Sequence, residues 1–447
     1  MRARRRACCI VVVTLVLAAG GCREPAGPAA PAAASAVLFI ADGMGPGYTA
    51  VTRVALGGSG GRLRLDGLPN TALLRTHAAD APVTDSAAAA SAMACGRKAP
   101  NGVICQDASA VFGRRDGKRL ESVALWAARR GLRVGVLTTT RVTDATAAAF
   151  YATHNDRSRE REIARQAIAS PLDFLLGGGR AAFRPEGGEE VAWSGDDRED
   201  LERSARRRGW RVVHTSRELG SIASLQRPVL GLFAAGPLPY EVPGDGAGAA
   251  GGGRSREAPT LEEMTVWAID RLAGTGEPFL LVIEAGRIDH AGHRNWARTA
   301  VAETAALDRA VGEAVDRLDP ETTLLLVTAD HETGGLVLNG YASEAEGIWT
   351  TYHPVDGGGS YPVLTFATGP SGAGGERSGP SGPDDARPAG FGAESAAHTG
   401  TDVVLYGWGK SSELVRGTLE NTAVYWLLRA HLEGRTPERS LLTRAPP

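Results

Sequence analysis

The segment Leu324-Leu-Leu-Val-Thr-Ala-Asp-His-Glu-Thr-Gly-Gly335 joins an apolar run to an acid and an imidazole. The apolar half predicts a buried strand, and Asp330 and His331 follow at its carboxyl end. Open α/β sheets carry their reactive groups at that edge, and oxygen and nitrogen ligands together suit zinc. A strand-end turn in which the two side chains only cap the next element is the simpler interpretation. The dipeptide therefore needs support from the rest of the chain.

Two further apolar runs end in an acid. Residues 36–41 lead to Asp42, and residues 279–283 lead to Glu284. Each acid has an ordinary alternative role, Asp42 as a helix cap and Glu284 as a salt-bridge partner. The recurrence of an apolar run that ends in an acid nevertheless favours reactive groups at the carboxyl ends of strands, where open α/β sheets keep them.

Histidines accompany these acids. Asp289 and His293 are four residues apart, so they share one face of a helical turn and could bind one ion. His398 stands just before the apolar run 403–406, although a loop histidine without special function would look the same. Four such sites in one chain, each supplying metal ligands, favour multi-metal hydrolysis.

Ser86 supplies a candidate nucleophile. It heads an Ala-rich helical segment, where unpaired N–H groups and the helix dipole favour an anion. Asp85 and Ser86 could instead form a plain N-cap. Four alanines after Ser86 leave room for a phosphoryl group and metal ions. No Gly-x-Ser-x-Gly elbow is present, so metal coordination would have to activate this serine.

These motifs resemble those of the alkaline phosphatase family, in the same order, over most of the chain from about Ala36 to Trp408. The resemblance implies a metal-dependent phosphomonoesterase that hydrolyses phosphate monoesters through a phosphoserine on Ser86. The matching motifs are Ala41-Asp-Gly-Met-Gly45, Thr84-Asp-Ser-Ala-Ala88, Thr138-Thr-Thr-Arg-Val-Thr-Asp-Ala-Thr146, Glu284 to His293, Thr328-Ala-Asp-His-Glu-Thr-Gly-Gly335 and His398-Thr-Gly400.

The resemblance also implies two zinc ions and one magnesium ion. The first zinc is expected on Asp289, His293 and His398, and the second on Asp42, Asp330 and His331. Magnesium is expected on Asp42, Thr146 and Glu284, with Asp144 reaching it through water. Three ligands per zinc leave an open position, as in catalytic zinc sites, and an all-oxygen set suits magnesium.

Two further residues are assigned by the same resemblance. Arg157 aligns with the arginine that grips two phosphate oxygens, for which a planar guanidinium is suited. Arg159 is its competitor, and a solvated arginine in the charged run 157–165 is the simpler interpretation. His290, paired with Asp144, is expected to modulate product release and pH optimum, unless it is a helix-surface histidine.

Two other functions remain as alternatives. A phosphodiesterase or phosphonate hydrolase on the same core is disfavoured, because relatives of that kind often use threonine and lack the arginine, whereas Ser86 and Arg157 are present. A non-catalytic phosphate-binding lipoprotein is disfavoured because every expected ligand is intact. The net charge is −2 over 447 residues, and no basic stripe with interleaved aromatics indicates nucleic-acid binding.

The amino terminus predicts export. Arginines at positions 2 and 4–6 precede an apolar run too short to span a bilayer, which is typical of a signal peptide over residues 1–21. Cys22 follows small residues, as in a bacterial lipoprotein cleavage box, so a lipid anchor at Cys22 is expected, with simple cleavage as the alternative. Residues 22–35 then form a Pro/Ala tether. The protein is accordingly expected in the periplasm or at the cell surface.

Two cysteines, Cys95 and Cys105, lie outside the predicted signal peptide and the predicted lipid anchor. Cys95 and Cys105 could close a small disulfide in an oxidising compartment or could be two buried free thiols. Their spacing alone leaves both alternatives open.

Apolar runs alternate with helical patterns, which predicts an α/β fold with a largely parallel central sheet and helices on both faces. Residues 36–436 form the catalytic domain, with an accessory lobe and loop at about 339–395 that is expected to hold substrate preference and contacts of a homodimer. Gly/Pro-rich stretches at 243–259 and 369–391 are expected to be connectors or lids. Strands are expected near 36–41, 133–138, 173–176, 210–214, 229–234, 279–284, 323–328 and 403–406, and helices at 121–130, 159–169, 197–208, 261–273 and 299–318.

Overall fold

The computed structural model describes residues 34–184, 199–241, 257–340, 343, 347–353, 358–370 and 387–444. The predictions for the signal peptide, for Cys22 and for most of the tether lie outside these residues. So do most of the stretches 243–259 and 369–391. No helix within the described ranges is long and apolar enough to cross a membrane.

A ten-stranded sheet forms the centre of the fold, in the order β17-β2-β16-β8-β1-β7-β3-β4-β6-β5. The seven strands from β8 to β5 are parallel, whereas β16 runs antiparallel to both of its neighbours. The expected α/β fold with a largely parallel sheet is therefore confirmed. The strands are β1 (Ser35–Ile40), β2 (Asn70–Arg75), β3 (Arg133–Arg141), β4 (Phe174–Gly178), β5 (Arg211–Val213), β6 (Val229–Leu232), β7 (Phe279–Glu284), β8 (Thr323–Thr328), β16 (Val403–Gly409) and β17 (Gly417–Glu420).

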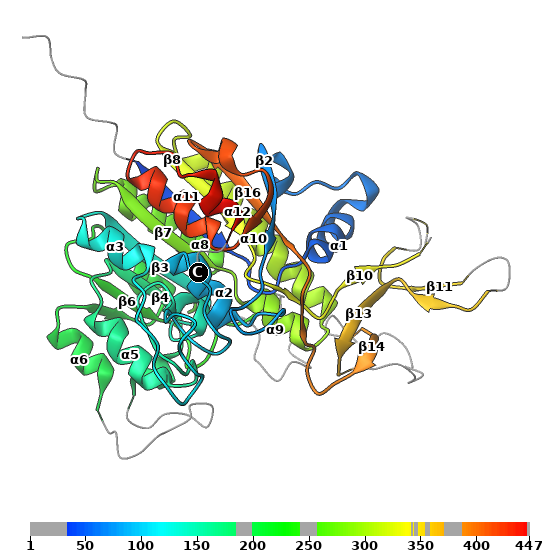
Figure 1. Cartoon of the computed structure of the whole chain (residues 1–447), viewed down its shortest axis with the longest axis horizontal. Coiled ribbons are helices and arrows are strands. Elements are labelled where there is room, and N and C mark those ends of the chain that lie inside the picture. Colours follow the sequence, from blue (N-terminus) through cyan, green and yellow to red (C-terminus); the bar gives the residue numbers. More distant parts are fainter. Residues whose placement is uncertain are drawn as a thin grey trace, which may run out of the picture. The chain divides into compact units, whose positions relative to one another are not determined.

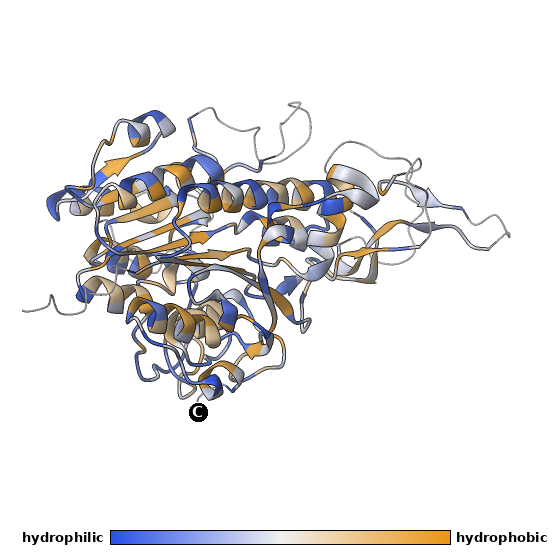
Figure 2. Cartoon of the chain, turned by 90° about the horizontal axis from the view of Figure 1, so that it is seen from above, coloured by the Kyte–Doolittle hydropathy of each residue, from blue (hydrophilic) through white to orange (hydrophobic). Residues whose placement is uncertain are grey.

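Helices lie on both sides of this sheet, as Figure 2 shows with the apolar strands between two layers of helices. Because both faces are covered, every residue of β1, β7 and β8 is buried. The helices are α1 (Pro46–Gly57), α2 (Ser86–Cys95), α3 (Val123–Arg129), α4 (Ala145–Ala148), α5 (Glu160–Ala169), α6 (Leu201–Arg207), α7 (Ser216–Gly220), α8 (Leu261–Ala273), α9 (Arg287–His293), α10 (Ala297–Arg317), α11 (Ala423–Leu432) and α12 (Arg439–Thr443).

The carboxyl ends of β1, β7 and β8 lie side by side and position the site. In the parallel register, Ile40 at the end of β1 pairs with Glu284 on one side and with Thr328 on the other. Asp42 and Asp330 each follow two residues after these paired positions, so the three acids emerge together. The sequence pattern of apolar runs that end in acids is thus converted into one cluster at the sheet edge.

A short antiparallel pairing adds the last histidine. It joins β9 (Glu332–Thr333) to β15 (His398–Thr399), with His398 opposite Thr333. This pairing brings the segment that contains His398 beside the turn that carries His331.

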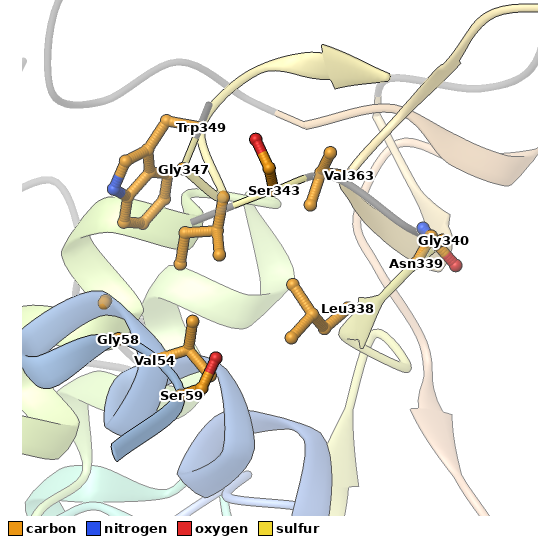
Figure 3. Close-up of a pocket in the computed structure, with 12 residues that line it drawn as sticks. Val54, Gly58, Ser59, Leu338, Asn339, Gly340, Ser343, Gly347, Trp349 and Val363 are labelled. Carbon is orange, nitrogen blue, oxygen red and sulfur yellow. The ribbon is translucent and has the colours of Figure 1, made fainter. Parts of the chain in front are cut away.

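Strands β10 to β14 form a small lobe, seen in yellow and orange in Figure 1. It consists of the sheet β10-β13-β14 and the hairpin of β11 and β12. A cavity of about 400 Å³ lies between this lobe and α1, lined by Val54 and Ala55 on the helix side and by Leu338, Trp349 and Val363 on the lobe side (Figure 3). None of the expected metal ligands lines it. The lobe strands are β10 (Val337–Leu338), β11 (Thr351–Tyr352), β12 (Tyr361–Pro362), β13 (Leu364–Gly369) and β14 (Ala389–Gly392).

Candidate metal centre

Carboxylates and a histidine from β1 and β8 meet at the sheet edge. The imidazole Nε2 of His331 lies 3.5 Å from Asp42 Oδ1 and 3.2 Å from Asp330 Oδ2. Asp330 Oδ1 accepts hydrogen bonds from the backbone N–H of Gly43 at 3.1 Å and of His331 at 2.9 Å. Gly43 has a φ of +76°, and a Cβ there would come within 2.8 Å of the Asp289 backbone. Glycine at this position therefore lets the two acid-bearing segments approach each other.

Helix α9 contributes a second group of potential metal ligands. His293 Nε2 lies 3.3 Å from Asp289 Oδ2, one helical turn away. His398 Nε2 lies 3.2 Å from His293 Nε2 and 3.7 Å from Asp289 Oδ1. The rings of His331 and His398 stack with centroids 3.6 Å apart. Two sets of three potential ligands result, Asp289 with His293 and His398, and Asp42 with Asp289 and His331.

Hydrogen bonds at the opposite ring nitrogens orient two of these histidines. His398 Nδ1 lies 2.9 Å from the carbonyl oxygen of Thr84, and His293 Nδ1 lies 2.6 Å from that of Ala396. A carbonyl oxygen can only accept, so both Nδ1 atoms carry the proton and both Nε2 atoms present a lone pair. Two lone pairs 3.2 Å apart repel each other unless a cation lies between them.

The third histidine is oriented by Thr333. The Thr333 hydroxyl donates its proton to Asp289 Oδ1 at 2.5 Å and lies 3.3 Å from His331 Nδ1. With its only proton engaged, the hydroxyl accepts from His331 Nδ1–H, which leaves a lone pair on His331 Nε2. The hydroxyl of Tyr48 in turn donates to the Thr333 carbonyl oxygen at 2.5 Å. Neither Thr333 nor Tyr48 is among the site residues predicted from the sequence. The role of Thr333 could have been predicted, because it lies two residues after His331 and side chains at that spacing in an extended chain share a face.

The buried acids also fit a cation. Asp42 Oδ1, Asp330 Oδ2 and Glu284 Oε1 accept no hydrogen bond from any described residue. Burial, with the charges of neighbouring carboxylates, raises the pKa of Asp330 to about 7 and that of Glu284 to about 8. The pKa of Asp42 is likewise raised, by burial and then by the charges of Asp330 and Asp289. Several acids that resist ionisation together are a site where divalent cations supply the missing positive charge.

The acids and hydroxyl expected around magnesium are less closely gathered. Thr146 Oγ1 donates to Asp42 Oδ2 at 3.4 Å, and Glu284 Oε2 accepts from Thr140 at 3.3 Å. Asp144 is turned to arginines, with Oδ2 3.2 Å from Arg141. Thr146 therefore contacts the acid cluster directly, whereas Asp144 does not.

Ser86 lies within the same cluster as the first residue of α2. Its Oγ is 3.2 Å from His331 Nε2, and the residue is 4% exposed. Asp85 is the N-cap, because its Oδ1 accepts from the Ala88 N–H at 2.9 Å. The capping role thus belongs to Asp85, which leaves the Ser86 hydroxyl free to face the acids and histidines.

Arg157 and Arg159 differ in what they contact. Arg157 Nη1 donates to Asp85 Oδ2 at 3.0 Å, and its Nη2 lies 3.6 Å from Asp144 Oδ1. Arg159 pairs with the nearby Asp156 at 3.4 Å, and its side chain is more exposed than that of Arg157. The side chain of Arg157 is therefore held next to Ser86 through Asp85.

His290 lies beside Asp289 but turns to another partner. Its Nδ1 lies 2.7 Å from Arg287 Nη1. Burial lowers the pKa of His290 to about 4, which keeps the ring neutral and able to accept from the guanidinium. Asp144 contributes to His290 only through its charge.

Comparison with known proteins agrees with this geometry. A family model described as alkaline phosphatase matches residues 33–433. The membrane-bound alkaline phosphatase of Bombyx mori is 32% identical over 446 residues, which cover 88% of this chain and 78% of that protein. The tissue-nonspecific alkaline phosphatase of Gallus gallus is 31% identical over 442 residues, covering 87% and 82%.

Solved structures give the same result. The alkaline phosphatase of Thermus thermophilus superposes with a TM-score of 0.67 at 26% identity, covering 93% of this chain and 96% of its own. That of the Antarctic bacterium TAB5 has a TM-score of 0.65 at 24% identity and covers 89% and 97%. The model match, the relatives and the fold thus agree over nearly the whole described chain. The chain belongs to the alkaline phosphatase family and is a metal-binding phosphoric monoester hydrolase.

Proposed function

We propose that this protein is an exported phosphomonoesterase that works through a phosphoserine on Ser86 at a site for two zinc ions and one magnesium ion. The observation that carries the proposal is the convergence of three histidine Nε2 lone pairs on Asp289 and Asp42, within 4.8 Å in each group. Nitrogen with carboxylate oxygen is the ligand set that zinc prefers. Export follows from the signal-like amino terminus, with Cys22 as the expected lipid anchor.

The ligand assignment follows the contacts. Asp289, His293 and His398 would hold the first zinc. Asp42, Asp330 and His331 would hold the second. Asp42 would also serve magnesium with Thr146 and Glu284, while Asp144 would act through water because its carboxylate faces Arg141 and Arg157. A structure of a TAB5 alkaline phosphatase variant has Mg bound in its M3 site, which is consistent with a third position in this family.

Different residues of the chain would carry out different steps of the reaction. When bound, divalent cations lower the pKa of a hydroxyl nucleophile and stabilise the leaving oxygen. Ser86 Oγ attacks phosphorus, the substrate alcohol leaves, and water later cleaves the phosphoserine to release phosphate. Arg157 provides a planar pair of N–H donors for two phosphate oxygens. Asp85 holds this guanidinium through a hydrogen bond, so little side-chain entropy is lost when phosphate binds.

Turnover of two substrates tests the function. The purified protein should hydrolyse an aryl phosphate monoester much faster than the corresponding diester, and elemental analysis should find zinc and magnesium. Faster turnover of the diester would favour the phosphodiesterase alternative. Absence of bound metal and of hydrolysis of both esters would favour the non-catalytic one.

Replacing Arg157 by alanine is expected to lower kcat/KM for the monoester by roughly 10- to 100-fold, because one bidentate charge-assisted contact is lost. Inhibition by inorganic phosphate should weaken in parallel. Steady-state kinetics and phosphate inhibition measure both effects. Arg159→Ala is the matched control, two residues away with its ion pair to Asp156, and should behave as wild type. Equal losses in both variants would remove Arg157 from the phosphate site.

Replacing Thr333 by valine keeps the shape of the side chain but removes the hydroxyl that joins Asp289 to His331. Zinc affinity is expected to fall by roughly 10- to 100-fold, since ligands are held by such neighbouring hydrogen bonds. Competition with a chromophoric chelator measures the affinity. Thr333→Ser retains the hydroxyl and should restore most of the binding. Wild-type affinity in the valine variant would contradict the assignment.

The metal-free protein should lose stability as pH rises from 6.5 to about 8, because the folded-state pKa values of Asp330 and Glu284 are raised to about 7 and about 8. The folded protein binds their protons more tightly than the unfolded chain does. This contribution is complete below the unfolded-state carboxyl pKa of about 4. It declines as pH rises above that value and is fully lost once pH passes the folded pKa. Urea unfolding of chelator-treated protein across this range measures the slope. Zinc-loaded protein should lack the decline, and a chelated form that gains stability with pH would oppose the cluster.

A further inference from the structure

The loop that follows α2, residues 96–105, connects the nucleophile helix to the phosphate-gripping arginine. Asn101 Oδ1 accepts from the Asp85 N–H at 2.8 Å, and the Gly102 N–H donates to Asp85 Oδ2 at 3.0 Å. The Gly102 carbonyl oxygen accepts from the Arg157 N–H at 3.0 Å. This α2 loop therefore fixes the Asp85 carboxylate, which holds the Arg157 guanidinium, and also the backbone of Arg157.

The two cysteines stand where this loop begins and ends. Cys95 is the last residue of α2, and its Sγ lies 2.9 Å from Sγ of Cys105, closer than unbonded sulfur atoms normally approach. Both residues are buried, and both are free thiols in this structure. The Cys105 Sγ also lies 3.0 Å from the carbonyl oxygen of Ala149, next to α4.

The backbone around Cys105 holds its sulfur at that place. Cys105 has a φ of +47°, which residues other than glycine seldom adopt. Its N–H donates to Ser91 Oγ at 2.7 Å. Its carbonyl oxygen accepts from the Leu120 N–H at 2.9 Å and from Thr153 Oγ1 at 3.1 Å. A strained conformation persists only where its surroundings impose it, so these hydrogen bonds fix the Cys105 backbone from which the sulfur reaches Cys95.

We propose that Cys95 and Cys105 form a disulfide that closes the α2 loop and thereby holds Asp85 and Arg157 in place for phosphate binding. The cysteine pair and its geometry do not depend on the reaction, whereas the effect on phosphate rests on the function proposed for Arg157. Closing the loop removes conformations from the unfolded chain and restricts opening of the loop in the folded one.

The bond forms by thiol–disulfide exchange. One cysteine thiolate attacks a disulfide donor, the second displaces the mixed disulfide, and the two cysteines give up two protons and two electrons as the donor is reduced to two thiols. Burial raises the pKa of the Cys95 thiol, which makes the thiolate scarce in the folded protein. Exchange therefore takes place before the loop is buried, in the oxidising compartment that the signal-like amino terminus indicates.

Peptide mapping of wild-type protein tests the bond without any mutation. Trypsin cleaves after Arg97 and Lys98, so Cys95 and Cys105 fall on separate peptides, 76–97 and 99–114. Protein exported to an oxidising compartment and alkylated in denaturant should yield these two peptides joined, and prior reduction should release them. Complete alkylation of both thiols without reduction would overturn the proposal.

Variants test what the bond does. The same bond is lost in Cys95→Ala, in Cys105→Ala and in the double variant, so all three should lower Tm by the same amount. All three should also weaken inhibition by inorganic phosphate to the same extent, by roughly two- to fivefold. If only packing mattered, the double variant would lose the sum of the single losses. A linked peptide with unchanged phosphate inhibition would refute the role in holding Arg157. Failure of every form to hydrolyse monoesters would instead refute the proposed function, while the linked peptide would still establish the bond.

Discussion

Replacing Ser86 by alanine is expected to lower kcat for a phosphate monoester by roughly 10³- to 10⁵-fold, because the covalent route is lost. Ser86 Oγ is the hydroxyl that faces the cluster at 3.2 Å from His331 Nε2. The residual rate should exceed that of the uncatalysed reaction, since bound metals can still direct water to phosphorus. Steady-state kinetics and acid-quench detection of phosphoserine measure the two effects.

The control for this variant is Ser440→Ala in α12, an exposed position. It should keep the wild-type rate and the phosphoserine signal. Metal content should be equal in both variants, because Ser86 is not among the proposed ligands. Turnover unchanged in Ser86→Ala would defeat the covalent mechanism and leave the metal site standing.

Replacing Asp289 by asparagine is expected to have an effect at least as large, roughly 10³-fold or more on kcat/KM, with loss of bound zinc. Asp289 is assigned to the first zinc with His293 and His398, and its carboxylate also lies within 4.8 Å of the ligand atoms of Asp42 and His331. The amide keeps the size of the side chain but gives up the negative charge that attracts a cation. Elemental analysis and the rise of Tm on zinc addition report the loss independently of turnover.

The matched control is Asp316→Asn on α10, an exposed carboxylate that pairs with Arg64. A surface ion pair of this kind contributes little to stability, so zinc content and activity should be those of wild type. An Asp289→Asn protein that retains two zinc ions would contradict the assignment of Asp289 to the first zinc.

Most of the central sheet was predictable from local pattern. All eight expected strands lie in it, because long apolar runs bounded by turns are readable without tertiary knowledge. Strands β2 and β17 were not predicted, since β2 has only three buried or half-buried positions in alternation and β17 begins exposed. Helix α11 was also missed, because a short apolar run suits a strand or a helix equally.

Helix ends were less accurately predicted than helix positions. The prediction of 261–273 matches α8, where a capping box of Thr260 and Glu263 marks the start. The prediction of 299–318 begins two residues later than α10, which has no side-chain cap at its start. Local capping chemistry therefore explains where prediction from sequence is accurate and where it is not.

The sequence by itself determined that Asp42, Glu284, Asp330 and His331 reach the carboxyl edge of the sheet, because strand ends follow from local apolar runs and parallel strands align their ends. Only the tertiary structure decided how the imidazoles point. The proton on His398 Nδ1 is set by the carbonyl of Thr84, 314 residues away, and that on His331 by Thr333 through Asp289. Hydrogen-bond direction depends on atoms brought together by packing, and no local pattern of residues encodes it.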